Sequence, residues 1–201
     1  MLSTVWKNEE TMKIAAIVLG VLLLFGFILG GKILGTRNDL VVQREAVTAS
    51  WSQVDVVLQR RADLIPNLVS TVQGYAKQEK DVFTAIANAR SALIGARNPS
   101  EKIAANGQLD GALSRLLVIT ENYPQLKSNE NFLRLQDELS GTENRIAIER
   151  RKYNEAVQKY NTNIDLFPNN IAASIFGFSR NDAYFKTDPG ARTAPKVNFD
   201  K

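Results

Sequence analysis

The stretch FLRLQDELSGTENRIAIERRKYNEAVQKYNTNI, residues 132–164, decides the fold class. Its stripe residues recur in steps of three and four, which places them on one face of an α-helix. The stripe consists of Phe132, Leu135, Leu139, Thr142, Ile146, Glu149, Tyr153, Val157, Tyr160 and Ile164. Ser128 is placed to cap this helix and Pro168 to stop it. The sequence therefore predicts one long amphipathic helix with a face turned toward partner helices.

Three segments upstream repeat this pattern. The first carries Leu40, Val47, Trp51, Val54, Leu58 and Ile65, and the second carries Leu68, Val72, Tyr75, Glu79, Val82, Ile86, Ala89 and Leu93. The third is expected to begin at a Ser100 cap and to end at Pro124. No segment alternates with period two, so no sheet is expected. The predicted fold is all-α, with four amphipathic helices forming a bundle over residues 35–166.

The junction between the first two segments is the sequence RRADLIPNLV, residues 60–69. Pro66 would cost about 3 kcal/mol in a helix interior but little in a first turn. We therefore expect a tight helix-to-helix junction in which Asp63 caps the new helix, while Arg60 and Arg61 lie at the negative end of the preceding one. The alternative is a single helix kinked at Pro66.

An apolar run, IAAIVLGVLLLFGFILGG, covers residues 14–31 without a charged or polar side chain. Together with Leu34, beyond a snorkelling Lys32, its length matches a bilayer and predicts a transmembrane anchor over residues 14–34. A buried core helix and a cleaved signal peptide are the alternatives, and the missing A-x-A site argues against cleavage. Residues 1–13 form a short flank before the anchor.

The orientation of the anchor is only weakly encoded. Two lysines, Lys7 and Lys13, precede the apolar run, whereas Lys32, Arg37 and Arg44 follow it. Because cations accumulate in cytoplasmic segments, three against two favours a cytoplasmic C-terminal domain. The margin is one charge, which leaves the opposite orientation open.

Composition excludes several kinds of chemistry. The chain contains no cysteine and no histidine, which removes disulfides, thiolate sites, histidine metal ligands and Ser-His-Asp triads. The formal charge of +4 comes from 25 basic and 21 acidic residues that are interspersed, so a mixed solvated surface is favoured over a nucleic-acid site. We expect no catalytic residues, no cofactor, no metal and no nucleic-acid partner.

Four polar side chains interrupt the apolar stripes, at Arg61, Glu79, Thr142 and Glu149. One interpretation is a polar seam that fixes the register of the helices or receives a partner. The other is that these side chains extend to the edge of the bundle and reach solvent.

Residues 167–201 form a capping segment and tail that is rich in aromatic residues and punctuated by proline. The segment either folds over the end of the bundle or presents a surface to a membrane or a neighbouring subunit. Its interface candidates are Phe167, Ile171, Ile175, Phe176 and Phe178.

Four stretches of this chain resemble the LemA family: SWSQVDVVLQRRADLIPNLVSTVQGYA (50–76), NYPQLKSNENFLRLQDELSGTENRIAIERRKYNEAVQKYN (122–161), FPNNIAASIFGF (167–178) and the closing APKVNF. The similarity covers the anchor and essentially the whole body. One small departure is Ser50, directly before the tryptophan, where the family tends to have alanine. The resemblance implies a bacterial protein, single-pass in the cytoplasmic (inner) membrane, with an up-and-down four-helix bundle. It also implies no established catalytic activity, and some relatives have been linked to membrane compartments.

The function expected from these observations is a non-enzymatic membrane-anchored scaffold that self-associates. Anchoring in a plane raises the effective concentration of each copy. The aromatic side chains of the C-terminal segment also form an apolar surface that a partner is expected to bury. The expected partners are therefore the lipid bilayer and further copies of the chain. An adaptor or regulator of another membrane protein, such as a membrane protease, is the alternative, and an unrecognised enzyme is the third hypothesis.

Overall fold

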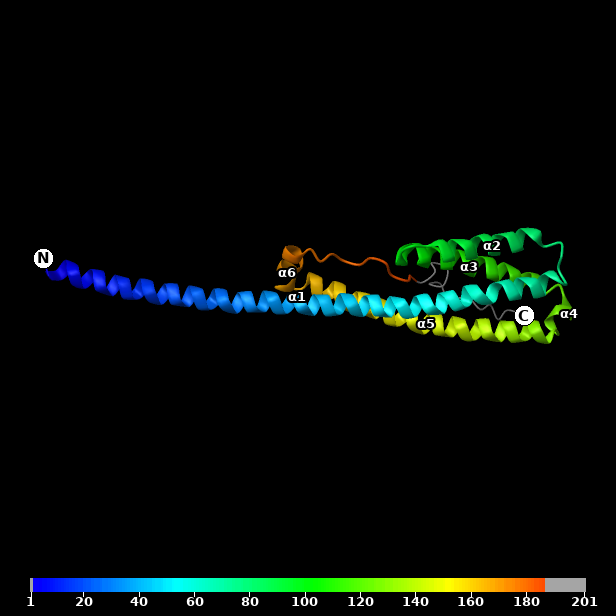
Figure 1. Cartoon of the computed structure of the whole chain (residues 1–201), viewed down its shortest axis with the longest axis horizontal. Helices are drawn as coiled ribbons and strands as arrows, with labels where there is room; N and C mark the ends of the chain where they lie inside the picture. Colours follow the sequence, from blue (N-terminus) through cyan, green and yellow to red (C-terminus); the bar gives the residue numbers. More distant parts are fainter. Residues whose placement is uncertain (1, 187–201) are drawn as a thin grey trace, which may run out of the picture. The chain divides into compact units, whose positions relative to one another are not determined.

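The computed structural model describes residues 2–186, and every regular element in that range is a helix (Figure 1). The helices are α1 (Leu2–Gln73), α2 (Lys80–Gly95), α3 (Pro99–Thr120), α4 (Pro124–Lys127), α5 (Glu130–Asp165) and α6 (Asn169–Phe176). The all-α prediction is confirmed for this part of the chain, but the number of helices is six rather than four. The predicted tail beyond residue 186, with its APKVNF stretch, lies outside the described residues.

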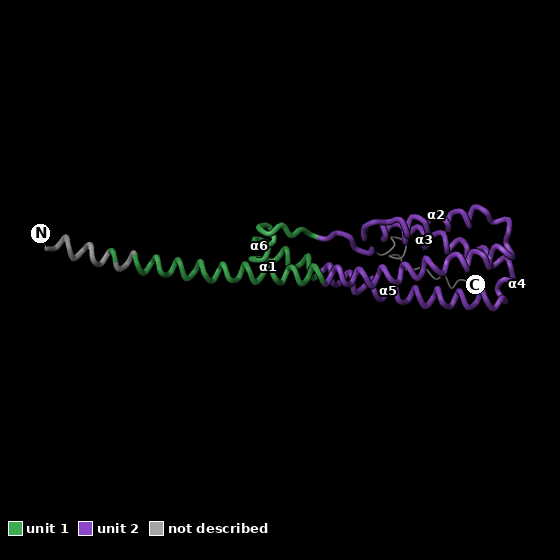
Figure 2. Tube along the Cα trace, viewed as in Figure 1, with its two compact units in different colours: residues 1–45, 159–180 green, residues 46–158, 181–201 purple. Residues whose placement is uncertain are grey.

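The chain divides into two compact units, coloured separately in Figure 2. Unit 1 consists of residues 1–45 and 159–180, and unit 2 of residues 46–158 and 181–201. This division differs from the linear order of anchor, bundle and tail because α1 and α5 each contribute residues to both units.

In unit 1, α1 carries the apolar run. The side chains of residues 16–31 are all exposed, and within the described residues α1 is the one helix long and apolar enough to cross a membrane. Exposure on every side is incompatible with the alternative of a buried core helix. Near the end of the run α6 packs by its two buried alanines, Ala172 and Ala173, and it ends at Gly177, whose φ of 70° is a left-handed cap.

The predicted helix-to-helix junction is wrong, because α1 continues through Arg60, Arg61, Asp63 and Pro66 as a single helix. Asp63 caps nothing, and its Oδ1 instead accepts a hydrogen bond from Gln59 Nε2 at 2.9 Å. Proline has no N–H to donate to the carbonyl four residues earlier, which belongs to Ala62.

A side chain from α2 compensates for this missing donor. Arg90 Nε donates to the Ala62 carbonyl oxygen at 2.7 Å, so a buried acceptor next to the proline has a partner. The helix therefore tolerates Pro66 through a tertiary contact.

The predicted second segment is divided by a turn. Leu68 and Val72 belong to α1, whereas Val82 to Leu93 belong to α2, and Tyr75 and Glu79 lie in the connection. The helix ends just before Gly74, a residue with low helix propensity, and Ala76 N donates back to the Val72 carbonyl at 2.9 Å.

Both predicted caps are displaced. Asn98, rather than Ser100, caps α3, and its Oδ1 accepts from Glu101 N at 2.9 Å with Pro99 in the first turn. The Glu101 carboxylate turns back to accept from Arg97 N at 2.8 Å, which resembles a capping box shifted by one residue. Asn129, rather than Ser128, serves α5, since its Oδ1 accepts from the Phe132 N–H at 3.0 Å.

The core of unit 2 lies where α1, α2, α3 and α5 meet. Most of its largest buried side chains lie on the predicted stripes, among them Val54, Leu58, Ile65, Ile86, Ile146 and Tyr153. The Lys102–Asp55 ion pair links α3 to α1, and the Arg90 contact links α2 to α1. The periodic positions of the sequence therefore identify most of this core.

Candidate functional site

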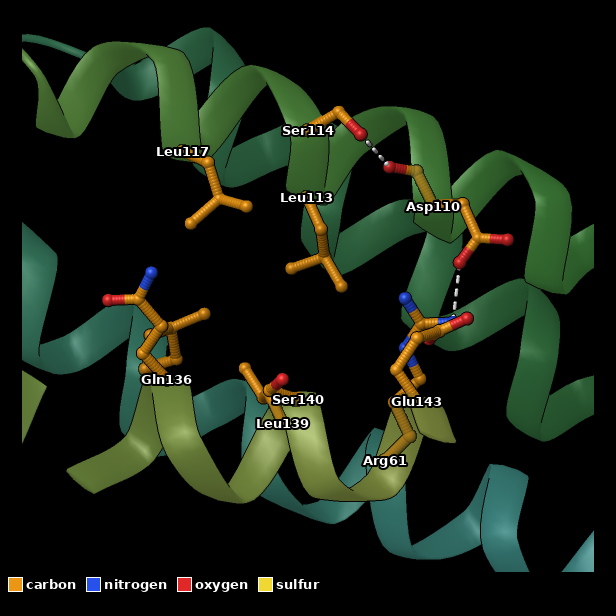
Figure 3. Close-up of a pocket in the computed structure, with 10 residues that line it drawn as sticks. Arg61, Asp110, Leu113, Ser114, Leu117, Gln136, Leu139, Ser140 and Glu143 are labelled. Atoms are coloured by element: carbon orange, nitrogen blue, oxygen red, sulfur yellow. Dashed lines mark hydrogen bonds and ion pairs between the residues drawn. The ribbon is translucent and has the colours of Figure 1, made fainter. Parts of the chain in front are cut away.

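A groove opens between α3 and α5 in unit 2, with a volume of about 440 Å³ (Figure 3). Leu113 and Leu117 on α3 point toward Leu139 and Gln136 on α5 across this space, and Leu68 of α1 contributes to its lining. Leu113 and Leu117 are four residues apart and share a face of α3, so this wall is apolar. On α5, Leu139 lies among the polar Gln136, Ser140 and Glu143.

The apolar surface continues beyond this groove. A second cavity of about 320 Å³ shares Leu117 and Gln136 with it and adds Phe132 and Leu133. Leu117 is 44% exposed and the neighbouring Val118 is 69% exposed. Exposed apolar side chains beside a groove are typical of a site for another protein segment.

A polar cluster closes one end of the groove. Arg61 of α1, only 7% exposed, has its Nη1 2.5 Å from Asp110 Oδ1 and 3.2 Å from Glu143 Oε2. The same nitrogen donates to Asn106 Oδ1 at 3.0 Å. A buried guanidinium needs such partners because the loss of its hydration is costly. The cluster thereby connects α1, α3 and α5 at one level.

Asp110 is shared by several donors. Asn106 Nδ2 donates to its Oδ2 at 3.0 Å, and Arg150 Nη2 of α5 lies 3.6 Å from the same oxygen. Arg61 and Arg150 face Asp110 and Glu143, so two cations are matched by two carboxylates. A balanced, mutually bonded set of this kind suits a structural role in fixing helix register.

The four predicted seam residues do not form one seam. Only Arg61 joins the polar cluster, while Thr142 is buried and donates to the Glu138 carbonyl of its own helix at 2.8 Å. Glu149 pairs with Lys152 at 2.8 Å, and Glu79 lies before α2 without capping it by its side chain.

Sequence reasoning did not identify Asn106, Asp110, Glu143 or Arg150 as members of the cluster. The available signal was the i, i+4 pair of Asn106 and Asp110, next to the apolar Ala105 and Leu109 on α3.

The C-terminal segment docks against the side of unit 2. Phe185 stacks 6.2 Å from Trp51 and lies edge-on to Tyr153 at 6.0 Å. The Asn154 side chain makes two hydrogen bonds to the backbone of Phe185. Its Nδ2 donates to Phe185 O at 2.8 Å, and its Oδ1 accepts from Phe185 N at 3.0 Å. The Arg150 guanidinium sits 4.9 Å above the Phe185 ring.

The interface candidates in unit 1 divide into two groups. Phe176 and Phe178 are half-buried, with Arg37 and Arg44 of α1 over their rings at 5.6 and 5.3 Å. Phe167, Ile171 and Ile175 remain exposed.

Comparison with known proteins places this architecture in a family. Residues 50–199 match the family model described as the LemA family, a range that includes the groove and the polar cluster. The chain belongs to the LemA family.

Relatives of this LemA-family chain include two proteins of Paramagnetospirillum magneticum, named magnetosome protein MamQ 1 and MamQ 2. Each is 29% identical to it over 205 residues, which is 89% of this chain and 74% of the relative. A protein named LemA from Metamycoplasma hominis is 24% identical over 140 residues, which is 69% of this chain and 64% of that protein.

Nothing in the site of this LemA-family protein points to catalysis. Neither the LemA family nor the MamQ relatives are known as enzymes. Within the described residues no group of three or more acidic side chains could hold a metal ion. Ser114, which lines the groove, donates its hydroxyl to the Asp110 carbonyl at 2.8 Å.

Proposed function

We propose that the protein is a non-enzymatic, membrane-anchored helical scaffold that self-associates and thereby organises or shapes the membrane. Residues 14–34 are its retained single-pass anchor in the bacterial cytoplasmic membrane, and its body acts as an up-and-down bundle of four long helices on the cytoplasmic side. The apolar groove between α3 and α5 is the observation that carries this proposal.

The groove suits a helix from a second copy. Its walls present Leu113, Leu117 and Leu139, which is the type of surface that receives the apolar face of an amphipathic helix. The polar cluster at one end is already internally bonded, so a helix that docks there does not have to neutralise an unpaired charge. Binding therefore relies on burying apolar area.

Anchoring supports self-association over capture of a rare partner. All copies lie in one plane, which raises their effective concentration and makes weak lateral contacts productive. A contact between different surfaces of neighbouring copies closes into a ring or continues as a filament. The names of the relatives as magnetosome proteins support a membrane-organising role.

The test uses the full chain in mild detergent and in membranes. Leu117→Glu places a charge on the groove wall, whereas Val56→Glu, at a 64% exposed position of α1 in unit 2, is the matched control. We expect light scattering and lysine cross-linking to show an oligomer for the unchanged chain and for Val56→Glu, and mainly monomer for Leu117→Glu.

A strictly monomeric unchanged chain, in detergent and in membranes, would rule out the scaffold. The same groove would then be assigned to an adaptor or regulator of another membrane protein, and a helix of that protein would be its occupant. Equal loss of assembly in both glutamate variants would contradict the assignment to the groove.

A further inference from the structure

The outer face of α6 in unit 1 is apolar and uncovered by the described part of the chain. Phe167 is 80% exposed, Ile175 is 62% exposed, and Leu166 and Ile171 are about half exposed. Ile171 and Ile175 are four residues apart within α6, so they align along one side, while Ala172 and Ala173 are buried on another; Phe167 lies just before the helix. The short helix is therefore amphipathic, with its larger apolar side chains turned outward.

The attachment point of α6 on α1 lies just beyond the apolar run. Thr36 Oγ1 donates to Asn169 Oδ1, in the first turn of α6, at 3.2 Å. Thr36 follows Leu34, the end of the predicted anchor, by two residues, which is about 3 Å along a helix. When the run spans a bilayer, α6 is at the level of its polar boundary.

The direction of α6 also fits that boundary. Its first residue contacts Thr36, and Phe176 at its other end lies under the Arg37 guanidinium at 5.6 Å. In Figure 1 the short helix lies across α1 rather than along it. A helix that crosses a spanning helix lies in the plane of the membrane.

Cationic side chains lie near the same level of α1. Lys32 and Arg37, within about 6 Å of Thr36 along the helix, are exposed, and their charges suit the anionic headgroups of a bilayer surface. An outward apolar face beside exposed cations is the pattern of a helix that rests in the interface of a membrane.

We propose that α6 is an interfacial membrane helix, with Phe167, Ile171 and Ile175 inserted at the boundary between headgroups and acyl chains. This inference rests on the anchor of the proposed function and adds a second membrane contact to it. A second copy is a poorer occupant, because four apolar side chains fall far short of the roughly 20–30 residues that each side of a standard protein interface uses. Self-association is then assigned to the groove of unit 2 alone.

The chain contains no cysteine, so single cysteines can be labelled cleanly in the full-length protein. Ile175→Cys and Phe167→Cys report on α6, Leu23→Cys reports on the apolar run, and Gln108→Cys, at an exposed position of α3, is the aqueous control. Each variant is labelled with a polarity-sensitive fluorophore and reconstituted into vesicles of equal parts phosphatidylethanolamine and phosphatidylglycerol. Quenching is measured with lipids that carry a nitroxide near the headgroup or deep in the acyl chain.

Both α6 labels should be quenched several-fold more strongly by the shallow nitroxide than the Gln108 label, and Leu23 most strongly by the deep one. An α6 label as weakly quenched as Gln108, with Leu23 still quenched, would overturn the inference and leave the anchor intact. Disulfide cross-linking through Ile175→Cys, without lipid quenching, would instead assign the face to a second copy. Absence of lipid quenching at Leu23 would contradict the anchor itself.

Discussion

Arg90 of α2 donates a hydrogen bond to the backbone carbonyl of Ala62, the acceptor that Pro66 cannot serve from within α1. Ala62 is completely buried, so this carbonyl has little access to water. The proline and the arginine, 24 positions apart in the sequence, thus act as a structural pair. A residue that would otherwise break the helix creates the site at which α2 is fastened to α1.

The first prediction concerns the contact between Arg90 and the Ala62 carbonyl beside Pro66. Arg90→Met should lower the free energy of unfolding by about 1–3 kcal/mol, because it leaves a buried carbonyl without its donor. In a Pro66→Ala background, residue 66 regains an N–H that can serve the Ala62 carbonyl. Arg90→Met should then lower the free energy of unfolding by clearly less. Urea unfolding of the full chain in mild detergent, followed by circular dichroism, measures both steps of the cycle.

Two variants serve as controls for that cycle. Arg115→Met, on the exposed face of α3, and Asp63→Ala, on the exposed face of α1, should each change the free energy of unfolding by less than about 0.5 kcal/mol. A cost of about 1 kcal/mol or more for Asp63→Ala would instead support a cap at this position.

The second prediction concerns the polar cluster. Asp110→Ala removes the partner that Arg61 contacts at 2.5 Å, and it should reduce the free energy of unfolding by about 1–3 kcal/mol. Arg61→Met introduced together with Asp110→Ala should recover part of this loss, since it removes a buried guanidinium that the single variant leaves with only Glu143 and Asn106 as partners. Thermal unfolding of the two single variants and the double variant gives the coupling, and strictly additive losses would argue against the cluster.

The third prediction is a loss of stability in alkali. Burial raises the pKa of the Tyr153 phenol above its ordinary value. Since the folded pKa exceeds the unfolded value of about 10, the folded state retains a proton that the unfolded state loses. The contribution of this phenol to the free energy of unfolding is thus fully present below about pH 10. It is lost as the pH rises through the pKa of the phenol in the folded state.

Tyr153→Phe should therefore flatten the decline above about pH 10, as measured by unfolding midpoints across the pH series. Burial also raises the pKa of Tyr160, so part of the decline should remain in the variant. An identical alkaline profile for the unchanged chain and for Tyr153→Phe would show that this phenol does not contribute.

The fourth prediction concerns the docked C-terminal segment. Asn154→Ala removes both hydrogen bonds to the Phe185 backbone and should lower the stability of this contact by about 1–3 kcal/mol. Release of Phe185 exposes the Trp51 ring. In a Trp6→Phe background, where Trp51 is the single tryptophan, its fluorescence should shift to the red. Asn144→Ala, an exposed asparagine on α5, should leave the spectrum unchanged.

Local chemistry explains which parts of the fold were accessible to sequence reasoning. The stripe from Phe132 to Ile164 and the apolar run at residues 14–31 depend only on helical period and on continuous hydrophobicity, so both were recognised. The helix caps were missed by one or two residues, because Asn98 and Ser100, or Asn129 and Ser128, are all competent caps. The choice between them depends on the path of the connecting chain.

The sequence by itself thus determined the helical class, the apolar span, the family and most of the buried positions, since these follow from periodicity, length and motifs within single segments. Only the tertiary structure decided the continuity of α1 through Pro66, the cluster of Arg61 with Asp110 and Glu143, and the exposure of the outer face of α6. In each case the outcome depends on a partner distant in sequence, or on the absence of one among the described residues. A buried carbonyl, a buried charge and an apolar face each have a free energy set by what lies beside them in space.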